Sequence, residues 1–167
     1  MKYLEKEEGG IFFIPLFLPT GIKENIKQYR SFQFAEDQMY GYGRLIEKND
    51  STGDLIEIFN YTGKIPASKE VVIASGRRGD PLHTTLAFDR RRWRLIFGAG
   101  DYDKAVDSNY PQIKFLLGTE NSYELWEGGK KRKVDNSEAR SHSAWTILHP
   151  TRVEDAIRTN SVDRLKG

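Results

Sequence analysis

Side chains suited to acid–base or metal chemistry are few and widely spaced in this sequence. It contains three histidines, His83, His142 and His149, and no cysteine. None of the histidines falls in an HxH or HExxH spacing, which protein metal sites commonly use. A GxSxG sequence, typical of a nucleophilic serine on a strained turn, is absent, and the lack of cysteine excludes thiol chemistry. The sequence therefore predicts no catalytic residue, no metal and no cofactor.

Arginine is the more concentrated chemical feature, and two of its clusters could bind a partner. Arg77 and Arg78 lie in GRRGD, and Arg91 lies two residues before Trp93 in DRRRWRL. Guanidinium groups bind carboxylates and phosphates through paired hydrogen bonds, and a neighbouring tryptophan can stack on a nucleic-acid base. The alternative is that the second cluster is an exposed strand edge, or a loop leading into a strand, that stays solvated.

A third candidate surface lies in YGYGRLIE, which otherwise reads as a strand. Side chains alternate between the two faces of a strand, so Tyr40, Tyr42 and Arg44 share one side. Tyrosine and arginine are enriched among the residues that dominate binding energy in protein interfaces. We therefore expect these three side chains to form an outward row that contacts a partner.

Gly41 and Gly43 occupy the opposite side of the same expected strand. Glycine weakens a strand interior, so two glycines on one face need a physical reason. Their missing side chains leave room for a large aromatic ring over the backbone and allow the sheet to bend sharply. We expect the ring of Phe12 or Phe59 to lie there.

Apolar and aromatic runs predict most of the regular structure. Strands are expected within 9–18, 38–48, 55–61, 93–100, 112–118 and 122–134, the last being a hairpin whose solvated arm carries KKRK. Helices are expected after Thr20, where Ile22, Ile26 and Tyr29 share a face, and from Pro150. PASKEVVIAS fits either a short helical turn capped by Ser68, which we favour, or a strand. These elements predict a mainly β (α+β) fold: a small, strongly bent antiparallel sheet or barrel with a C-terminal helix and one or two short helices.

Length and composition are those of one globular domain spanning residues 1–167. The chain has 38% hydrophobic and 30% charged residues, and no apolar run approaches the roughly 18 residues needed to span a membrane. The N-terminus is acidic where an export signal would be apolar, and cysteine is absent, so we expect a cytoplasmic protein. A net charge of +2 is too small to predict nucleic-acid binding.

The order of these motifs resembles that of the Immunity protein 26 family of bacterial polymorphic toxin systems, a family whose name is shared with a phosphotriesterase relative. The resemblance is carried by GGIFFIPL, YGYGRLIE, EIFNY, WRLIFG, PQIKFLLG, YELWEGGKKRKV and the final HPTRVEDAI. Its sharpest part pairs residues 11–16 with 40–44, whereas residues 19–37 look like an expansion of a short turn.

The resemblance implies a cytoplasmic immunity protein that binds a cognate toxin, the C-terminal domain of a polymorphic or contact-dependent effector, and neutralises it by occlusion. It implies a protein partner, no membrane partner and no enzymatic activity. The alternatives are a phosphotriesterase-like hydrolase, which would use a metal-bound hydroxide, and a β-barrel that binds single-stranded nucleic acid. The residues expected to contact the toxin are Tyr40, Tyr42, Arg44, Arg77, Arg78, Arg91 and Trp93.

Overall fold

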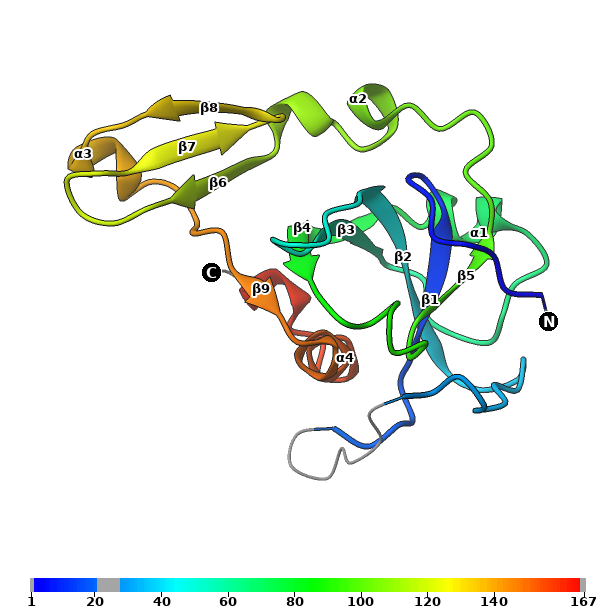
Figure 1. Cartoon of the computed structure of the whole chain (residues 1–167). Coiled ribbons are helices and arrows are strands. Elements are labelled where there is room, and N and C mark those ends of the chain that lie inside the picture. Colours follow the sequence, from blue (N-terminus) through cyan, green and yellow to red (C-terminus); the bar gives the residue numbers. More distant parts are fainter. Residues whose placement is uncertain (1, 21–27, 166–167) are drawn as a thin grey trace. The chain divides into compact units, whose positions relative to one another are not determined.

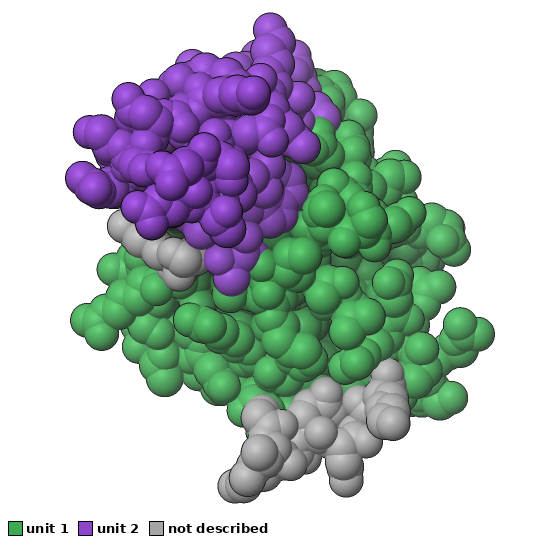
Figure 2. All heavy atoms as spheres, turned by 60° about the vertical axis from the view of Figure 1, so that its left-hand side comes forward, with its two compact units in different colours: residues 1–102, 147–165 green, residues 103–146, 166–167 purple. Residues whose placement is uncertain are grey.

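The computed structural model describes residues 2–20 and 28–165 of the chain (Figure 1). These residues form two compact units, which Figure 2 distinguishes by colour. Among the described residues, unit 1 contains those up to 102 together with 147–165, and unit 2 contains 103–146. A single domain over residues 1–167 stays a prediction. No helix in this part of the chain is long and apolar enough to cross a membrane.

Unit 1 is built on a six-stranded sheet (Figure 1). Across the sheet the strand order is β5 (Arg94–Phe97), β1 (Ile11–Pro15), β2 (Tyr40–Glu47), β3 (Asp54–Phe59), β4 (Arg77–Thr84) and β9 (Ile147–Leu148). Neighbouring strands are antiparallel except β4 and β9, which run parallel. With β5 and β9 at its edges the sheet stays open, so the predicted mainly antiparallel sheet is confirmed and the described chain does not close into a barrel.

One face of this sheet is covered by the C-terminal helix α4 (Pro150–Arg158). Phe12 and Ile14 of β1 and Leu45 of β2 are fully buried there, in one cluster with Val153 and Ile157 of the helix. We call this cluster the helix-side core. Burial of apolar side chains on one face of α4 matches the pattern expected of an amphipathic helix that packs on a sheet.

The opposite face of the sheet is buried as well. Tyr40 and Tyr42 of β2 pack with Tyr29, Phe34 and Val72, the last from helix α1 (Lys69–Ala74), in a cluster that we call the loop-side core. The prediction that Tyr40, Tyr42 and Arg44 form an outward row is therefore wrong, since all three side chains are buried. Alternation along a strand determines which side chains share a face, but it does not determine whether other segments cover that face.

The two glycines of β2 leave the space that their predicted role requires. A Cβ on Gly43 would lie 2.5 Å from Cζ of Phe12 and 2.7 Å from the carbonyl oxygen of Glu57. A Cβ on Gly41 would lie 3.0 Å from Cδ1 of Ile157 in α4. The ring over the backbone is thus that of Phe12, whereas Phe59 lies in the loop-side core.

Replacing Gly43 with alanine should destabilise the protein by about 1–3 kcal/mol, the usual result of overpacking a core. The added methyl group would meet both a buried ring and a backbone carbonyl, and the carbonyl cannot move without disturbing β3. Urea unfolding followed by circular dichroism measures the change. Gly41→Ala is the matched control and should cost less, because the atoms nearest to its methyl group belong to the side chains of Ile157, at 3.0 Å, and Ile14, at 3.8 Å. Equal stability of Gly43→Ala and the parent would show that the ring moves aside freely.

The predicted helices at Ser68 and Pro150 are confirmed. α1 follows Ser68, although the Ser68 side chain makes no capping hydrogen bond. α4 begins at Pro150, and Nδ1 of His149 accepts a hydrogen bond from the N–H of Thr151. The helix expected over 22–29 falls largely on residues outside the described ranges. A short 3-10 helix, Val162–Arg164, adds Val162 to the helix-side core.

Unit 2 is a small three-stranded antiparallel sheet with short helical turns. Its elements are α2 (Lys104–Asp107), a 3-10 turn (Tyr110–Gln112), β6 (Lys114–Leu117), β7 (Glu124–Glu127), β8 (Lys130–Lys133) and α3 (Asn136–Ala139). The rings of Phe115, Trp126 and Trp145 lie 5.4–6.0 Å apart between centroids and form its centre. Every residue of β8 is exposed, so the predicted solvated arm of the hairpin is confirmed.

Candidate partner-binding site

The structure places Tyr40 and Tyr42 in structural roles. The hydroxyl of Tyr40 donates to the carbonyl of Ala35 at 2.7 Å, and that of Tyr42 donates to the carbonyl of Gly63 at 3.0 Å. Burial raises the pKa of Tyr40 to about 12 and also raises the pKa of Tyr42. Both phenols therefore act as protonated donors that fasten neighbouring loops to β2.

Arg44 and Arg77 meet on one carboxylate. Nη1 of Arg44 lies 3.2 Å from Oε1 of Glu57, and Nε of Arg77 donates to Oε2 of Glu57 at 2.9 Å. The Arg44 guanidinium also lies over the rings of Phe59 and Tyr102, 5.3 and 4.9 Å from their centroids. Arg44 and Glu57 are buried, whereas Arg77 is partly exposed and extends this network toward the surface. Arg78, the next residue of β4, is half-buried.

Trp93 belongs to the helix-side core. Its ring stacks on Phe12, with centroids 5.5 Å apart, and its Nε1 donates to Oε2 of Glu154 at 3.0 Å. Only 1% of its surface is exposed, so the indole offers no face to an incoming base. The neighbouring Arg92 is buried to the same extent and binds Glu154 through Nε and Nη2, both at 2.7 Å. Residues 89–93 are a loop that leads into the edge strand β5, as the alternative expected, but Arg92 and Trp93 at its centre are buried and not exposed.

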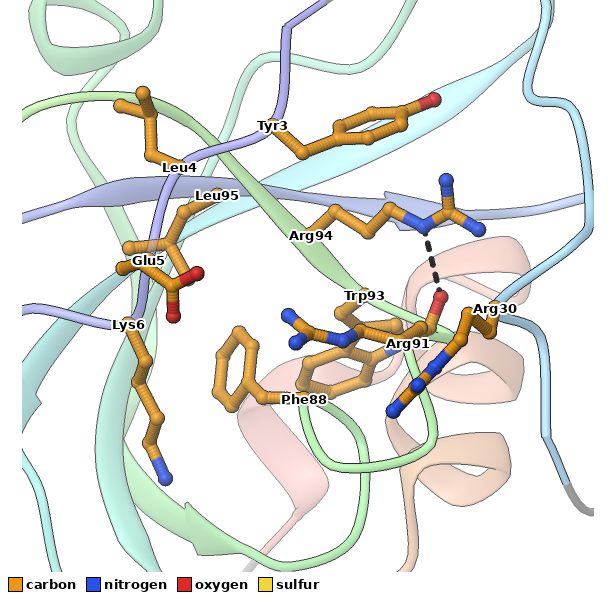
Figure 3. A pocket seen from close by; sticks show the side chains of 10 residues that line it. All are labelled: Tyr3, Leu4, Glu5, Lys6, Arg30, Phe88, Arg91, Trp93, Arg94 and Leu95. Carbon is orange, nitrogen blue, oxygen red and sulfur yellow. Dashed lines mark hydrogen bonds between the residues drawn. The ribbon is translucent and has the colours of Figure 1, made fainter.

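Arg91 points instead toward a cavity in unit 1. The cavity measures about 390 Å³ and is lined by residues 3–6, Arg30, Phe88 and residues from the 91–95 segment (Figure 3). We call it the Arg91 pocket. Among the predicted binding residues it brings together Arg91 and Trp93, whereas Tyr40, Tyr42, Arg44, Arg77 and Arg78 do not line it.

Two backbone hydrogen bonds bring distant segments to this pocket. The N–H of Leu4 donates to the carbonyl of Leu95 at 2.9 Å, which holds the N-terminal segment along β5. The N–H of Tyr29 donates to the carbonyl of Arg90 at 2.7 Å, so Arg30 lies beside the turn that carries Arg91. The two bonds join residue 4 to residue 95 and residue 29 to residue 90, so they connect segments that are far apart in the sequence.

The charges that line the Arg91 pocket are mostly positive. Lys6, Arg30, Arg91 and Arg94 are cationic, and Glu5 supplies the one carboxylate. Lys6 is neutralised by Asp54, with Nζ and Oδ2 2.6 Å apart. Within residues 2–20 and 28–165, none of the three arginines has an ion pair with a carboxylate. The pocket therefore holds positive charge that the described chain does not balance.

Arg94 is the most firmly held of these cations. Its Nε donates to the carbonyl of Arg91 at 3.0 Å, the bond drawn in Figure 3, and its Nη2 donates to the carbonyls of Tyr29 and Phe32. The guanidinium lies over the ring of Tyr3, 4.4 Å from the centroid. Burial lowers the pKa of Arg94, but a guanidinium titrates so far above neutrality that it stays charged.

Arg91 has an unusual backbone conformation. Its φ is +57°, in the left-handed region that costs most residues about 1–2 kcal/mol relative to glycine. The side chain is exposed, and Figure 3 shows it among those that line the pocket. Residues that persist in such conformations cluster at binding and active sites, which makes Arg91 a candidate binding residue.

The chemistry of the site is that of anion binding. Fixed guanidinium groups bind carboxylates or phosphates through charge-assisted hydrogen bonds, and they need no proton transfer to do so. In the described ranges no group of three or more histidine, aspartate or glutamate side chains is arranged to hold a metal ion.

The sequence prediction missed most of this pocket. It singled out Arg91 because of the arginine run, but it did not single out Tyr3, Lys6, Arg30 or Arg94. The run DRRRWRL was the signal available for Arg94. Tyr3, Lys6 and Arg30 carry no local signal, because long-range backbone contacts bring them to the site.

A family model described as Immunity protein 26 matches residues 7–122. The matched range is more than half of the chain and contains β1 to β5, which form most of the sheet of unit 1. Helix α4, which covers one face of that sheet, follows the matched range. No curated protein and no solved structure matches the chain.

Proposed function

The chain belongs to the Immunity protein 26 family, and on that basis we propose that it binds a cognate toxin domain and neutralises it by occlusion. The family match is the observation that carries the proposal. The partner is the C-terminal domain of a polymorphic or contact-dependent effector, and the protein acts in the cytoplasm as a single domain. Inhibition of this kind depends on complementary shape and charge and involves no turnover.

The Arg91 pocket supports this function as an anchoring point within a larger interface. Stable protein complexes bury about 800 Å² on each partner, and a few buried or charged residues dominate the binding energy. Arginine is among the residue types that do so. A concave site with unbalanced cations therefore offers one strong contact around which a partner surface can close.

The two alternatives lack such support. Binding of single-stranded nucleic acid by this cluster would place a base on Trp93, but its indole is buried against Phe12 and Glu154. The phosphotriesterase alternative has no observation in the described residues that favours it.

Cells that express the C-terminal domain of the effector encoded beside this gene should survive when they also express this protein, and the two chains should form a stable one-to-one complex. Size-exclusion chromatography with light scattering measures the complex, and colony counts measure survival. Cells that carry an unrelated immunity protein serve as the control. Absence of both protection and complex would refute the proposed function.

Occlusion also predicts that the toxin is unchanged by the encounter. Toxin separated from the complex in urea and refolded should have its original mass and its full activity. A changed mass, or permanent loss of activity after separation, would show that the protein acts by modifying the toxin.

A further inference from the structure

We propose that the Arg91 pocket receives a carboxylate side chain, an aspartate or glutamate on the surface of the toxin. The identity of the partner rests on the proposed function, whereas the chemistry of the ligand rests on the pocket. The carboxylate would lie between Arg30 and Arg91, with the buried charge of Arg94 behind it.

The first argument is the balance of charge. After Lys6 pairs with Asp54, three arginines face a single glutamate, Glu5, which is exposed. Arg94 is only 7% exposed, and its hydrogen bonds go to neutral carbonyl groups. A buried charge is stabilised when an opposite charge lies close to it, so an incoming anion would supply what the described chain lacks.

The second argument is that Arg94 and the backbone of the turn that carries Arg91 are held in place before any ligand arrives. Arg94 is fixed by three hydrogen bonds and by the ring of Tyr3. The turn that carries Arg91 is fixed through its backbone, because its carbonyl accepts one of those bonds. Groups that are already ordered lose less conformational entropy on binding, which strengthens the complex.

The third argument concerns the kind of anion. The cavity of about 390 Å³ is near the lower end of the roughly 300–1,000 Å³ range of small-ligand pockets, which suits one or two side chains. A nucleic-acid strand needs a positively charged groove along its backbone and exposed aromatic rings for its bases. Trp93 and Phe88 line the pocket but are only 1% and 6% exposed, and one face of the Tyr3 ring is covered by the Arg94 guanidinium, so the site offers little stacking surface.

The test compares full-length variants that remove one cation each. Arg30→Gln removes an exposed charge, and Arg91→Gly removes the other while placing glycine at a φ of +57° that favours it. The Arg91→Gly variant should therefore unfold at the same temperature as the parent or higher. Arg152→Gln removes an equal charge from an exposed position on α4 outside the pocket and is the matched control.

Each pocket variant should bind the effector domain about thirtyfold more weakly in titration calorimetry, the loss typical of one anchoring residue. The control should bind as the parent does, and the difference between parent and variants should shrink at high salt. If the effector domain binds the parent and both pocket variants equally, the pocket proposal is overturned while the proposed function stands.

A second measurement does not depend on the toxin. A peptide of four glutamates and a hexathymidylate oligonucleotide are titrated separately into the isotope-labelled parent, and amide shifts of residues 88–95 and the Arg Nε–H signals are followed by NMR. The proposal expects the peptide to shift these signals in the parent and not in the Arg30→Gln/Arg91→Gly double variant. Shifts produced by the oligonucleotide alone, or by neither probe, would overturn it.

Discussion

Replacement of Glu154 with glutamine should destabilise the protein by about 3–5 kcal/mol, the usual effect of breaking a buried ion pair from one side. Glu154 is 0% exposed and Arg92 is 1% exposed, and two hydrogen bonds of 2.7 Å join them. Glutamine keeps the size of the side chain but removes the negative charge that faces the buried guanidinium of Arg92. The loss of stability therefore measures the contribution of the charge, since the shape of the side chain is nearly unchanged.

The effect should be large because the pair joins several parts of unit 1. Arg92 also donates to the hydroxyl of Tyr29 at 2.6 Å and to the carbonyl of Pro19 at 2.8 Å, and Trp93 donates to Glu154. Burial raises the pKa of Glu154, and the adjacent Arg92 guanidinium opposes that rise. The charged form of the Glu154 carboxylate is thus stabilised mainly by Arg92.

Urea unfolding of four proteins separates the interaction from simple loss of packing. The parent is compared with Glu154→Gln, with Arg92→Met and with the double variant Arg92→Met/Glu154→Leu. The double variant should lose less stability than the two single losses added together, because neither side leaves a lone buried charge. Asp155→Asn, which affects an exposed carboxylate paired with Arg158, should cost no more than about 1 kcal/mol. A loss as small as this for Glu154→Gln would contradict the argument.

Most of the sheet could be predicted from the sequence because its strands carry dense apolar runs. β4 was missed because it begins with RRGD and contains Pro81, so neither an apolar run nor alternation marks it. β9 was missed because it has two residues and depends on pairing with β4. The glycines of β2 could be explained in advance, since the space above a glycine is a local property of the strand.

The burial of the aromatic and arginine residues could not be predicted in the same way. The ring of Tyr42 packs against that of Tyr61, with centroids 5.3 Å apart, and no sequence pattern around Tyr42 predicts this cover. Arg92 can be buried because its guanidinium pairs with Glu154, which lies 62 positions later in the sequence. A charged run reads as exposed unless its partner is known, and partners at such distances leave no periodic pattern.

His83 supplies the second large effect, which is a dependence of stability on pH. This histidine lies in β4 between Leu55 of β3 and Ile147 of β9, and it is 1% exposed. Burial lowers its pKa from 6.5 to about 3. The imidazole is therefore neutral in the folded protein over a range in which the unfolded chain takes up a proton.

The sign of the effect follows from that difference in proton binding. Between pH 6.5 and pH 3 the unfolded state binds one more proton at His83 than the folded state does, so stability falls as the pH falls. The folding equilibrium should change by a factor of about ten for each pH unit, or about 3 kcal/mol over two units. Above pH 6.5 the contribution is constant, and near pH 3 it levels off.

The measurement is urea unfolding of the parent and of His83→Leu at several values from pH 7.5 to pH 4. Carboxylates also respond to acid, but they do so in both proteins, so the difference between the two curves isolates His83. The parent should lose stability relative to His83→Leu as the pH drops below 6.5, whatever the stability of the variant at neutral pH. His142→Gln, at a partly exposed position beside Glu138, should give a curve closer to that of the parent. Parallel curves for the parent and His83→Leu would mean that His83 takes up its proton without unfolding the protein, and the role of burial at this position would have to be abandoned.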